Sequence, residues 1–299
     1  MIPYNQSSQS VIKSTSRPIQ VFPLLGNVDM QTVDSFGEEW STFHTFNEAE
    51  IFTAGDNYFD IVPEKILNKN TKALDVGCGT GRWSYYLSEK VGFVECVDPS
   101  KAVLAADNLL KDKNNIRISQ ASVDNIPFLD HSFDLVFSLG VLHHVPDTKD
   151  AIKKCVQKLR PNGYILLYLY YNLVNRGFIF KTLFHLSNSL RWGISKMPNV
   201  IKKIVCDLLA FFVYIPFVAL AKLCMALGMS QKWVHKIPLS WYADKSLRII
   251  RNDALDRFGT PLEQPFSKKE ITEMLEHGGC YNIVFAENAP YWRAIAQKV

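Results

Sequence analysis

The feature that most constrains this chain is the regular alternation of two kinds of segment between residues 72 and 171. Short apolar segments, which predict strands, lie at 72–76, 93–97, 116–121, 133–139 and 164–171. The segments that predict helices lie between them, at 83–90, 102–110 and 148–159. Strands that alternate with helices in this way form a mostly parallel sheet, because each helix returns the chain to the same edge. We therefore expect an α/β protein.

The alternation stops after residue 171 and resumes near residue 265. There, 267–279 predicts a capped helix, and 281–287 with 292–297 predicts an antiparallel hairpin at the sheet edge. The roughly ninety residues in between are far more than a connecting loop needs. We therefore divide the chain into a flexible N-terminal arm (1–30), a sheet domain (31–171 and 265–299) and an inserted helical lid (172–264).

The composition excludes several classes of protein. With 47% hydrophobic and 21% charged residues, the 299-residue chain can bury a large core and is not expected to be disordered. Its six cysteines are scattered without a CxxC pair or a Cys/His cluster, so we expect neither a disulfide framework nor a metal site. The N-terminus lacks the apolar core of a secretory signal, which favours a cytoplasmic location. A net charge of +4 is too small to indicate a nucleic-acid partner.

A glycine-rich loop follows the first of the alternating strands, in the sequence LDVGCGTG at 74–81. Its glycines, Gly77, Gly79 and Gly81, allow a ligand to approach the backbone closely. The spacing GxGxG is not the dinucleotide fingerprint, and Asp75 stands two residues before the first glycine. A carboxylate there repels a pyrophosphate but attracts an amino group. The loop therefore favours a ligand with a zwitterionic amino-acid tail, unless Asp75 is a structural carboxylate that only caps the loop.

The same run resembles motif I of the class I S-adenosylmethionine-dependent methyltransferases, in the subset similar to quinone-biosynthesis methyltransferases. VECVDPS (94–100), ASVDNIPF (121–128) and FDLVFSLGVLHHVPD (133–147) follow in the order of that family. The resemblance implies a Rossmann-like fold with a seven-stranded, mostly parallel sheet and an antiparallel C-terminal hairpin, here with an α-helical insertion. It also implies S-adenosylmethionine as the cofactor and S-adenosylhomocysteine as the product.

The resemblance further implies which residues bind the cofactor. Seven positions match the family's pattern: Asp75, Gly77, Gly79, Gly81, Asp98, Asp124 and Leu139. Asp75 matches the position that meets the methionine amine. Asp98 would accept hydrogen bonds from both ribose hydroxyls, and Asp124 one from the adenine amino group.

Two histidines are candidates for catalysis. His143 and His144 follow the fourth strand, at the carboxyl edge where open α/β sheets bind their ligands. Either could act as a general base. Methyl transfer from a sulfonium mainly demands positioning and exclusion of water, and some acceptors need no base. The alternative is that one histidine holds the loop or lines the pocket.

The insertion combines an apolar run with basic flanks. LLAFFVYIPFVALA, at 208–221, has no charged residue, is broken by Pro216 and is too short to span a bilayer. From 191 to 260 the chain carries eleven Lys/Arg, four Asp and no Glu, a local excess of +7. We expect the run to form the core of the lid, to pack in an oligomer, or, through 200–229, to touch the inner face of a membrane as a peripheral segment.

These features predict a methyltransferase with a small amphipathic acceptor, lipid-linked or anionic, of a glycan or lipid pathway. Two alternatives stay open: methylation of a soluble sugar nucleotide or other metabolite, and a catalytically silent scaffold that binds S-adenosylmethionine. A nucleic-acid acceptor is disfavoured because SLGVLHH stands where an NPPY-type motif would follow the fourth strand. The methylated atom, the use of a base and the oligomeric state are not determined by motifs that bind the donor.

Overall fold

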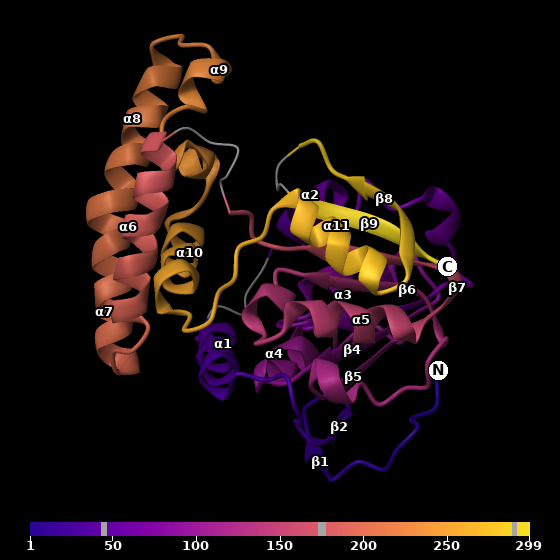
Figure 1. Cartoon of the computed structure of the whole chain (residues 1–299). Coiled ribbons are helices and arrows are strands. Elements are labelled where there is room, and N and C mark those ends of the chain that lie inside the picture. The colour runs from indigo at the N-terminus through magenta and orange to yellow at the C-terminus, as the bar shows by residue number, and fades with distance from the viewer. Residues whose placement is uncertain (43–46, 173–177, 289–291) are drawn as a thin grey trace. The chain divides into compact units, whose positions relative to one another are not determined.

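The computed structural model describes residues 1–42, 47–172, 178–288 and 292–299. The chain forms two compact units (Figure 1). The sheet unit comprises residues 1–174 and 262–299, and the helical unit comprises residues 175–261. Their boundaries lie three residues from those expected at 171/172 and 264/265. The insertion after the fifth alternating strand is therefore a compact unit of its own.

The sheet unit is built around one nine-stranded sheet, in the order β1-β2-β5-β4-β3-β6-β7-β9-β8. The strands are β1 (Ser10–Lys13), β2 (Pro18–Val21), β3 (Lys72–Val76), β4 (Phe93–Asp98), β5 (Ile116–Gln120), β6 (Phe133–Leu139), β7 (Leu159–Tyr168), β8 (Cys280–Phe285) and β9 (Arg293–Lys298). Neighbours from β2 to β7 are all parallel, whereas β9 is antiparallel to both β7 and β8. The predicted parallel sheet with an antiparallel C-terminal hairpin is confirmed.

The prediction of an arm without structure over 1–30 is wrong, because β1 and β2 extend the sheet beyond the seven expected strands. β2 pairs in parallel with β5, whose edge would otherwise be unpaired, and its Ile19 is fully buried. Arg17 fixes the turn before β2, since its guanidinium binds Asp107 (Nε to Oδ1, 3.0 Å) and the carbonyl of Ile116 (2.8 Å). Each of these strands has only four residues, too few for a clear alternation in the sequence.

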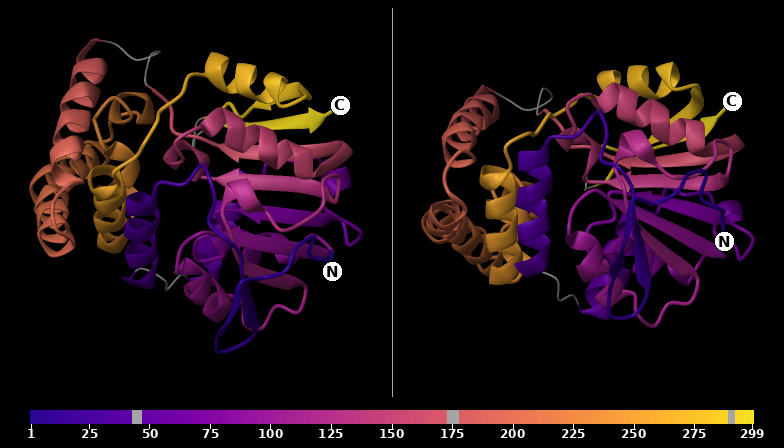
Figure 2. Two further views of the ribbon diagram at one scale, coloured as in Figure 1. Left: turned by 60° about the horizontal axis from the view of Figure 1, so that its bottom comes forward. Right: turned by 90° about the horizontal axis from the view of Figure 1, so that it is seen from below.

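Helices cover both faces of the sheet (Figure 2). On one face lie α5 (Thr148–Lys158) and α11 (Lys268–His277); on the other lie α2 (Glu48–Tyr58), α3 (Arg82–Ser88) and α4 (Ala102–Leu109). α1 (Met30–Thr42) packs against α4. In β7, Ile165 and Leu167 belong to the first core, and Tyr164 and Leu166 to the second. Because the strands are buried on both sides, functional polar groups are left to the strand ends and the loops that follow them.

The helical unit contains one helix that continues from Asn199 to Ala226 (Figure 1). It consists of α7 (Asn199–Leu209), a π-helical turn (Ala210–Tyr214) and α8 (Ile215–Ala226); α6 (Phe178–Ile194), α9 (Gln231–Val234) and α10 (Leu247–Gly259) complete the unit. The expected break at Pro216 is wrong. The amide of Ile215 bonds the carbonyl of Ala210, five residues back, and this wider turn accommodates the proline ring. By length and composition alone, the helix could cross a membrane.

Candidate functional site

The carboxyl ends of five neighbouring strands bring candidate residues into one row. From β5 to β7, the strand register aligns Gln120, Asp98, Gly77, Leu139 and Tyr168. Asp98 pairs directly with Gln120, Leu139 pairs with Tyr168, and Gly77 comes immediately after β3 between them. Open parallel sheets bind their ligands at this edge, beside the strand where the chain reverses its direction across the sheet. Three of the predicted residues, Asp98, Gly77 and Leu139, therefore lie on adjacent strands at the expected edge.

Asp98, at the end of β4, is held by the loop that follows β3. Its Oδ2 accepts a hydrogen bond from the amide of Gly79 (2.8 Å), and its Oδ1 accepts bonds from the amide (2.8 Å) and hydroxyl (2.6 Å) of Ser100. Burial raises the pKa of Asp98, and these hydrogen bonds offset part of the rise. A carboxylate has about four acceptor positions, so roughly one stays free, on Oδ2. Asp98 can therefore accept one further hydroxyl, and a second would have to displace a Ser100 contact.

The three glycines of the loop adopt positive φ angles: 79° at Gly77, 53° at Gly79 and 81° at Gly81. A Cβ atom at Gly77 would lie 2.3 Å from Cγ1 of Val141, and one at Gly81 would lie 2.6 Å from Cδ1 of Leu110. The packing of the protein itself therefore requires glycine at these two positions. Gly79 has a different role, since its amide joins the loop to the carboxylate at the end of β4.

Asp75, near the end of β3, has a buried carboxyl group that is only 1% exposed. Its Oδ2 accepts a hydrogen bond from the Ser84 hydroxyl (2.6 Å), which in turn accepts one from the Cys96 thiol (3.0 Å). Burial raises the pKa of Asp75 to about 7, although the Ser84 bond opposes the rise. An ammonium group beside this carboxyl would favour its charged form. The contacts suit both the ammonium-binding and the structural interpretation of Asp75.

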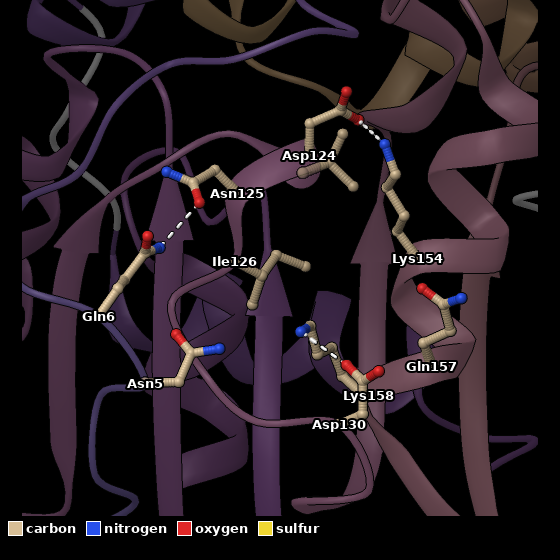
Figure 3. Close-up of a pocket in the computed structure, with 10 residues that line it drawn as sticks. Asn5, Gln6, Asp124, Asn125, Ile126, Asp130, Lys154, Gln157 and Lys158 are labelled. Atoms are coloured by element: carbon tan, nitrogen blue, oxygen red, sulfur yellow. Dashed lines mark hydrogen bonds and ion pairs between the residues drawn. The ribbon is translucent and has the colours of Figure 1, made fainter.

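Asp124 follows β5 and turns toward α5. Its Oδ1 lies 2.8 Å from Nζ of Lys154, and its Oδ2 accepts a hydrogen bond from the amide of Asn27 (2.8 Å). Both residues of the ion pair line a cavity of about 380 Å³, together with the N-terminal residues Asn5 and Gln6 (Figure 3). Both Asp124 oxygens thus have protein partners, and an adenine amino group would compete with one of them. Adenine binding by Asp124 stays a prediction.

The two predicted histidines lie in a short turn after β6, and both are buried, His143 at 0% and His144 at 6% exposed. The His143 ring stacks on Tyr170 with centroids 4.0 Å apart. Nδ1 of His144 lies 2.7 Å from the carbonyl oxygen of Leu262. A carbonyl only accepts, so Nδ1 carries the proton and Nε2 of the neutral ring carries a lone pair. Among the described residues, this Nε2 has no hydrogen-bond partner, so His144 presents a buried proton acceptor.

A file of aromatic side chains, in which each ring contacts the next, borders the histidines and was not predicted from the sequence. Neighbouring ring centroids are 4.0–5.8 Å apart along Trp83, Tyr58, Tyr168, Tyr170, His143, His144 and Phe36. The signal was YLYY at 168–171, which we interpreted only as the end of a strand. Aromatic faces attract cations, so a file beside the row suits a ligand with a positively charged centre.

Comparison with known proteins agrees with this arrangement. Residues 74–167, which contain the glycine loop, Asp98 and the end of β6, match the family described as a methyltransferase domain. The chain carries a class I S-adenosylmethionine-dependent methyltransferase domain. The predicted family and its Rossmann-like fold are therefore confirmed.

The relatives of this methyltransferase domain differ in what their names say they modify. Over 110 residues it is 36% identical to the demethylmenaquinone methyltransferase of Staphylococcus saprophyticus, which covers 36% of this chain and 47% of that protein. Over 116 residues it is 32% identical to the tRNA U34 carboxymethyltransferase of Nautilia profundicola, at 36% of this chain and 37% of that protein. A crystallised SAM-dependent methyltransferase from Aquifex aeolicus is 16% identical, with a TM-score of 0.45 over 85% of this chain and 100% of that one. The chain thus matches less than half the length of these two curated relatives.

The residues of the methyltransferase domain fit S-adenosylmethionine as its cofactor. The glycine loop suits an amino-acid tail, and the Asp98 carboxylate suits a ribose. The amide of Gly79 donates a hydrogen bond to Asp98 and so holds the two next to each other. Asp75 is a carboxyl group whose charged form an ammonium would favour. The aromatic file suits the sulfonium. These groups correspond to the amino acid, ribose and sulfonium parts of one molecule.

Proposed function

We propose that the chain transfers the methyl group of S-adenosylmethionine to a small amphipathic acceptor, lipid-linked or anionic in character. The observation that supports this best is the row of residues at the carboxyl ends of the strands, from Asp98 to Tyr168. Tyr168 also belongs to the aromatic file that includes His144, so the candidate cofactor residues and the candidate base are connected. S-adenosylmethionine, when bound, supplies an electrophilic methyl group on a sulfonium. The residues of the chain supply binding, orientation and exclusion of water.

Asp98 would orient the ribose of the cofactor. Its carboxylate is already fixed by Gly79 and Ser100, so little further ordering accompanies binding. Leu139 is buried at the end of β6 and would give the neighbouring part of the row an apolar surface. The row therefore combines a carboxylate that is fixed in place to accept hydrogen bonds from hydroxyl groups, Asp98, with an apolar surface that excludes water, at Leu139.

His144 is our candidate for the general base. The Leu262 carbonyl holds its ring in the tautomer whose Nε2 can accept a proton. A hydroxyl nucleophile would give its proton to this nitrogen, whereas a nucleophile that carries no such proton would leave His144 as a lining residue. His143 instead stacks face to face on Tyr170 and would hold the turn in place.

The helical unit supports an amphipathic acceptor. Between 191 and 260 the chain carries eleven Lys/Arg against four Asp, and apolar side chains such as Phe212 and Leu227 are exposed. Basic groups next to apolar ones suit a molecule that has an anionic part and an acyl or prenyl part. The cytoplasm, or the inner face of a membrane, is the location that this proposal requires.

The acceptor class is tested by transfer of a radiolabelled methyl group from S-adenosylmethionine into host-cell extract, followed by separation into organic and aqueous phases. Heat-denatured protein serves as the blank. We expect label in the organic phase, because the acceptor is amphipathic. Label only in the aqueous phase would support a soluble sugar nucleotide, another metabolite or an RNA instead. No label above the blank, from a protein that binds the cofactor, would favour a silent scaffold.

The affinity for S-adenosylmethionine is expected to fall as the pH is lowered through 7, by up to about tenfold per pH unit. Burial raises the pKa of Asp75 to about 7, so below this pH its carboxyl must lose a proton before it can pair with an ammonium. Above pH 7 the group is already charged and the affinity levels off. Calorimetric titrations at several pH values measure this dependence.

The variant Asp75→Asn separates the two interpretations of this residue. It keeps an oxygen that can accept the Ser84 hydroxyl hydrogen, but it carries no charge. We expect it to bind the cofactor more weakly at high pH and to lose the pH dependence. Equal affinity and an equal pH profile in both proteins would show that Asp75 is the structural carboxylate.

A further inference from the structure

The long helix of the helical unit, Asn199–Ala226, buries one face within that unit. Its buried apolar side chains recur every three or four residues and are each at most 6% exposed: Cys206, Ala210, Tyr214, Val218 and Ala221. Tyr214 contacts Tyr242 with ring centroids 5.5 Å apart, and Ala221 packs with Val234 and Ala243. This face therefore already has its partners inside the unit.

The opposite face of the same helix is apolar and exposed. Its side chains, 46–76% exposed, are Ile201, Ile204, Leu208, Phe212, Leu220, Leu223 and, just beyond the helix, Leu227. Their spacing of three or four residues, with Pro216 in the middle, places them in one stripe. At a rise of about 1.5 Å per residue, the stripe is about 40 Å long. Soluble proteins rarely expose a continuous apolar surface of this size unless it binds something.

Tryptophan and lysine side chains pair before and after this stripe. Nζ of Lys196 lies 3.7 Å from the ring centroid of Trp192, ahead of the helix. After the helix, Lys236 lies 3.8 Å from the ring of Trp233. Lys245 lies 5.0 Å from the exposed Trp241 and also pairs with Asp244. Tryptophan and lysine are the side chains that suit the boundary between lipid and water, because each has an apolar body and a polar end.

The charge of this surface indicates the sign of its partner. The sequence has no Asp or Glu from 208 to 243, whereas Lys222, Lys232 and Lys236 lie in that stretch. The carboxylate of Asp207, just before this stretch, accepts hydrogen bonds from Nε (2.7 Å) and Nη2 (2.8 Å) of Arg251. An apolar stripe with exposed lysines, along which the one acid is already paired with Arg251, complements a surface that is apolar inside and anionic outside.

The connections of the chain exclude a single membrane crossing by this helix. β7 precedes the helix and β9 follows it, yet the two strands pair in one sheet. The chain segments on either side of the helical unit must therefore lie on the same side of any membrane. Among the described residues, no other helix is long and apolar enough to cross back, so both ends of this helix lie on that same side. It can then lie in the plane of the interface, with its exposed stripe facing the acyl chains.

We propose that the helical unit binds an anionic lipid bilayer through the exposed stripe of the helix Asn199–Ala226, which lies in the plane of the membrane surface. The stripe enters the acyl region, the tryptophans lie at the headgroup level, and the lysines meet lipid phosphates. The inference concerns the helical unit alone and does not depend on the cofactor site of the sheet unit. Cofactor binding can therefore be measured separately on the same samples.

The test is flotation of the full chain with vesicles of phosphatidylcholine containing roughly a third phosphatidylglycerol, compared with pure phosphatidylcholine. We expect the wild type to float with the anionic vesicles, and less so at high salt. The double variant Phe212→Glu and Leu223→Glu should bind at least about tenfold more weakly, since both charges would enter the acyl region. Leu129→Glu changes an equally exposed leucine (60%) in the sheet unit and should float like the wild type.

Unchanged S-adenosylmethionine affinity would show that the sheet unit of each variant is folded, and an unchanged far-UV circular dichroism spectrum would show that the helices of the helical unit are kept. The proposal is overturned if the wild type does not float with anionic vesicles, or if the double variant floats as well as the wild type. It is also overturned if the wild type forms a dimer that the double variant dissociates and neither protein binds lipid, because the stripe would then serve self-association.

Discussion

Replacing His144 by Asn is expected to lower the rate of methyl transfer by about two to four orders of magnitude, with no change in the affinity for S-adenosylmethionine. The amide nitrogen of Asn can still donate to the Leu262 carbonyl, as Nδ1 of the histidine does. No atom of Asn occupies the place of Nε2, so the proton acceptor alone is lost. The measurement is the initial rate of label transfer into the extract fraction that contains the acceptor.

His131→Asn is the matched control for this substitution. Nδ1 of His131 also lies within hydrogen-bond distance of a backbone carbonyl, that of Leu159 (3.2 Å), before β6 begins. Its replacement should leave the rate of transfer unchanged. If His144→Asn turns over as fast as the wild type, His144 lines the pocket and no base is required at this position.

The parts of the fold that could be predicted from the sequence are those fixed by neighbours in the chain. Each strand and helix of the parallel sheet has its own apolar pattern, and a glycine-rich loop between two of them marks the edge that binds ligands. Gly77 directly follows β3 and Asp98 ends the adjacent strand β4, so their proximity follows from the order of the strands. The connection between them, through the amide of Gly79, is equally local.

The parts that could not be predicted depend on contacts between distant segments. Asp124 is held by Asn27, 97 residues earlier in the chain, and His144 is held by Leu262, 118 residues later. No local sequence pattern predicts partners that lie so far away in the chain. The aromatic file is similar, because its rings come from α1, α2, α3, the end of β7 and the turn after β6.

The role that the resemblance to known methyltransferases implies for Asp98 is limited by the contacts that this residue already makes. The resemblance implied that Asp98 binds both ribose hydroxyls, but Gly79 and Ser100 already use about three of its four acceptor positions. The carboxylate therefore has room for one charge-assisted hydrogen bond without rearrangement. Such a bond contributes about 1.5 to 3 kcal/mol.

Replacing Asp98 by Asn is accordingly expected to weaken S-adenosylmethionine binding about ten- to a hundredfold. The amide group has the shape of the carboxylate, but its nitrogen cannot accept a hydrogen bond. Asp134→Asn is the matched control. Asp134 also accepts a bond from a backbone amide of the neighbouring strand, that of Lys72 (2.7 Å), but at the start of β6 rather than at a carboxyl end. Its replacement should affect stability and leave cofactor affinity unchanged.

Calorimetric titration of S-adenosylmethionine into the wild type, Asp98→Asn and Asp134→Asn is the most direct test that the carboxyl edge of β3, β4 and β6 is the donor site. We predict one saturable site in the wild type, the same affinity in Asp134→Asn, and an affinity about ten- to a hundredfold lower in Asp98→Asn. Equal affinity in the wild type and Asp98→Asn, or no binding by the wild type, would contradict this account.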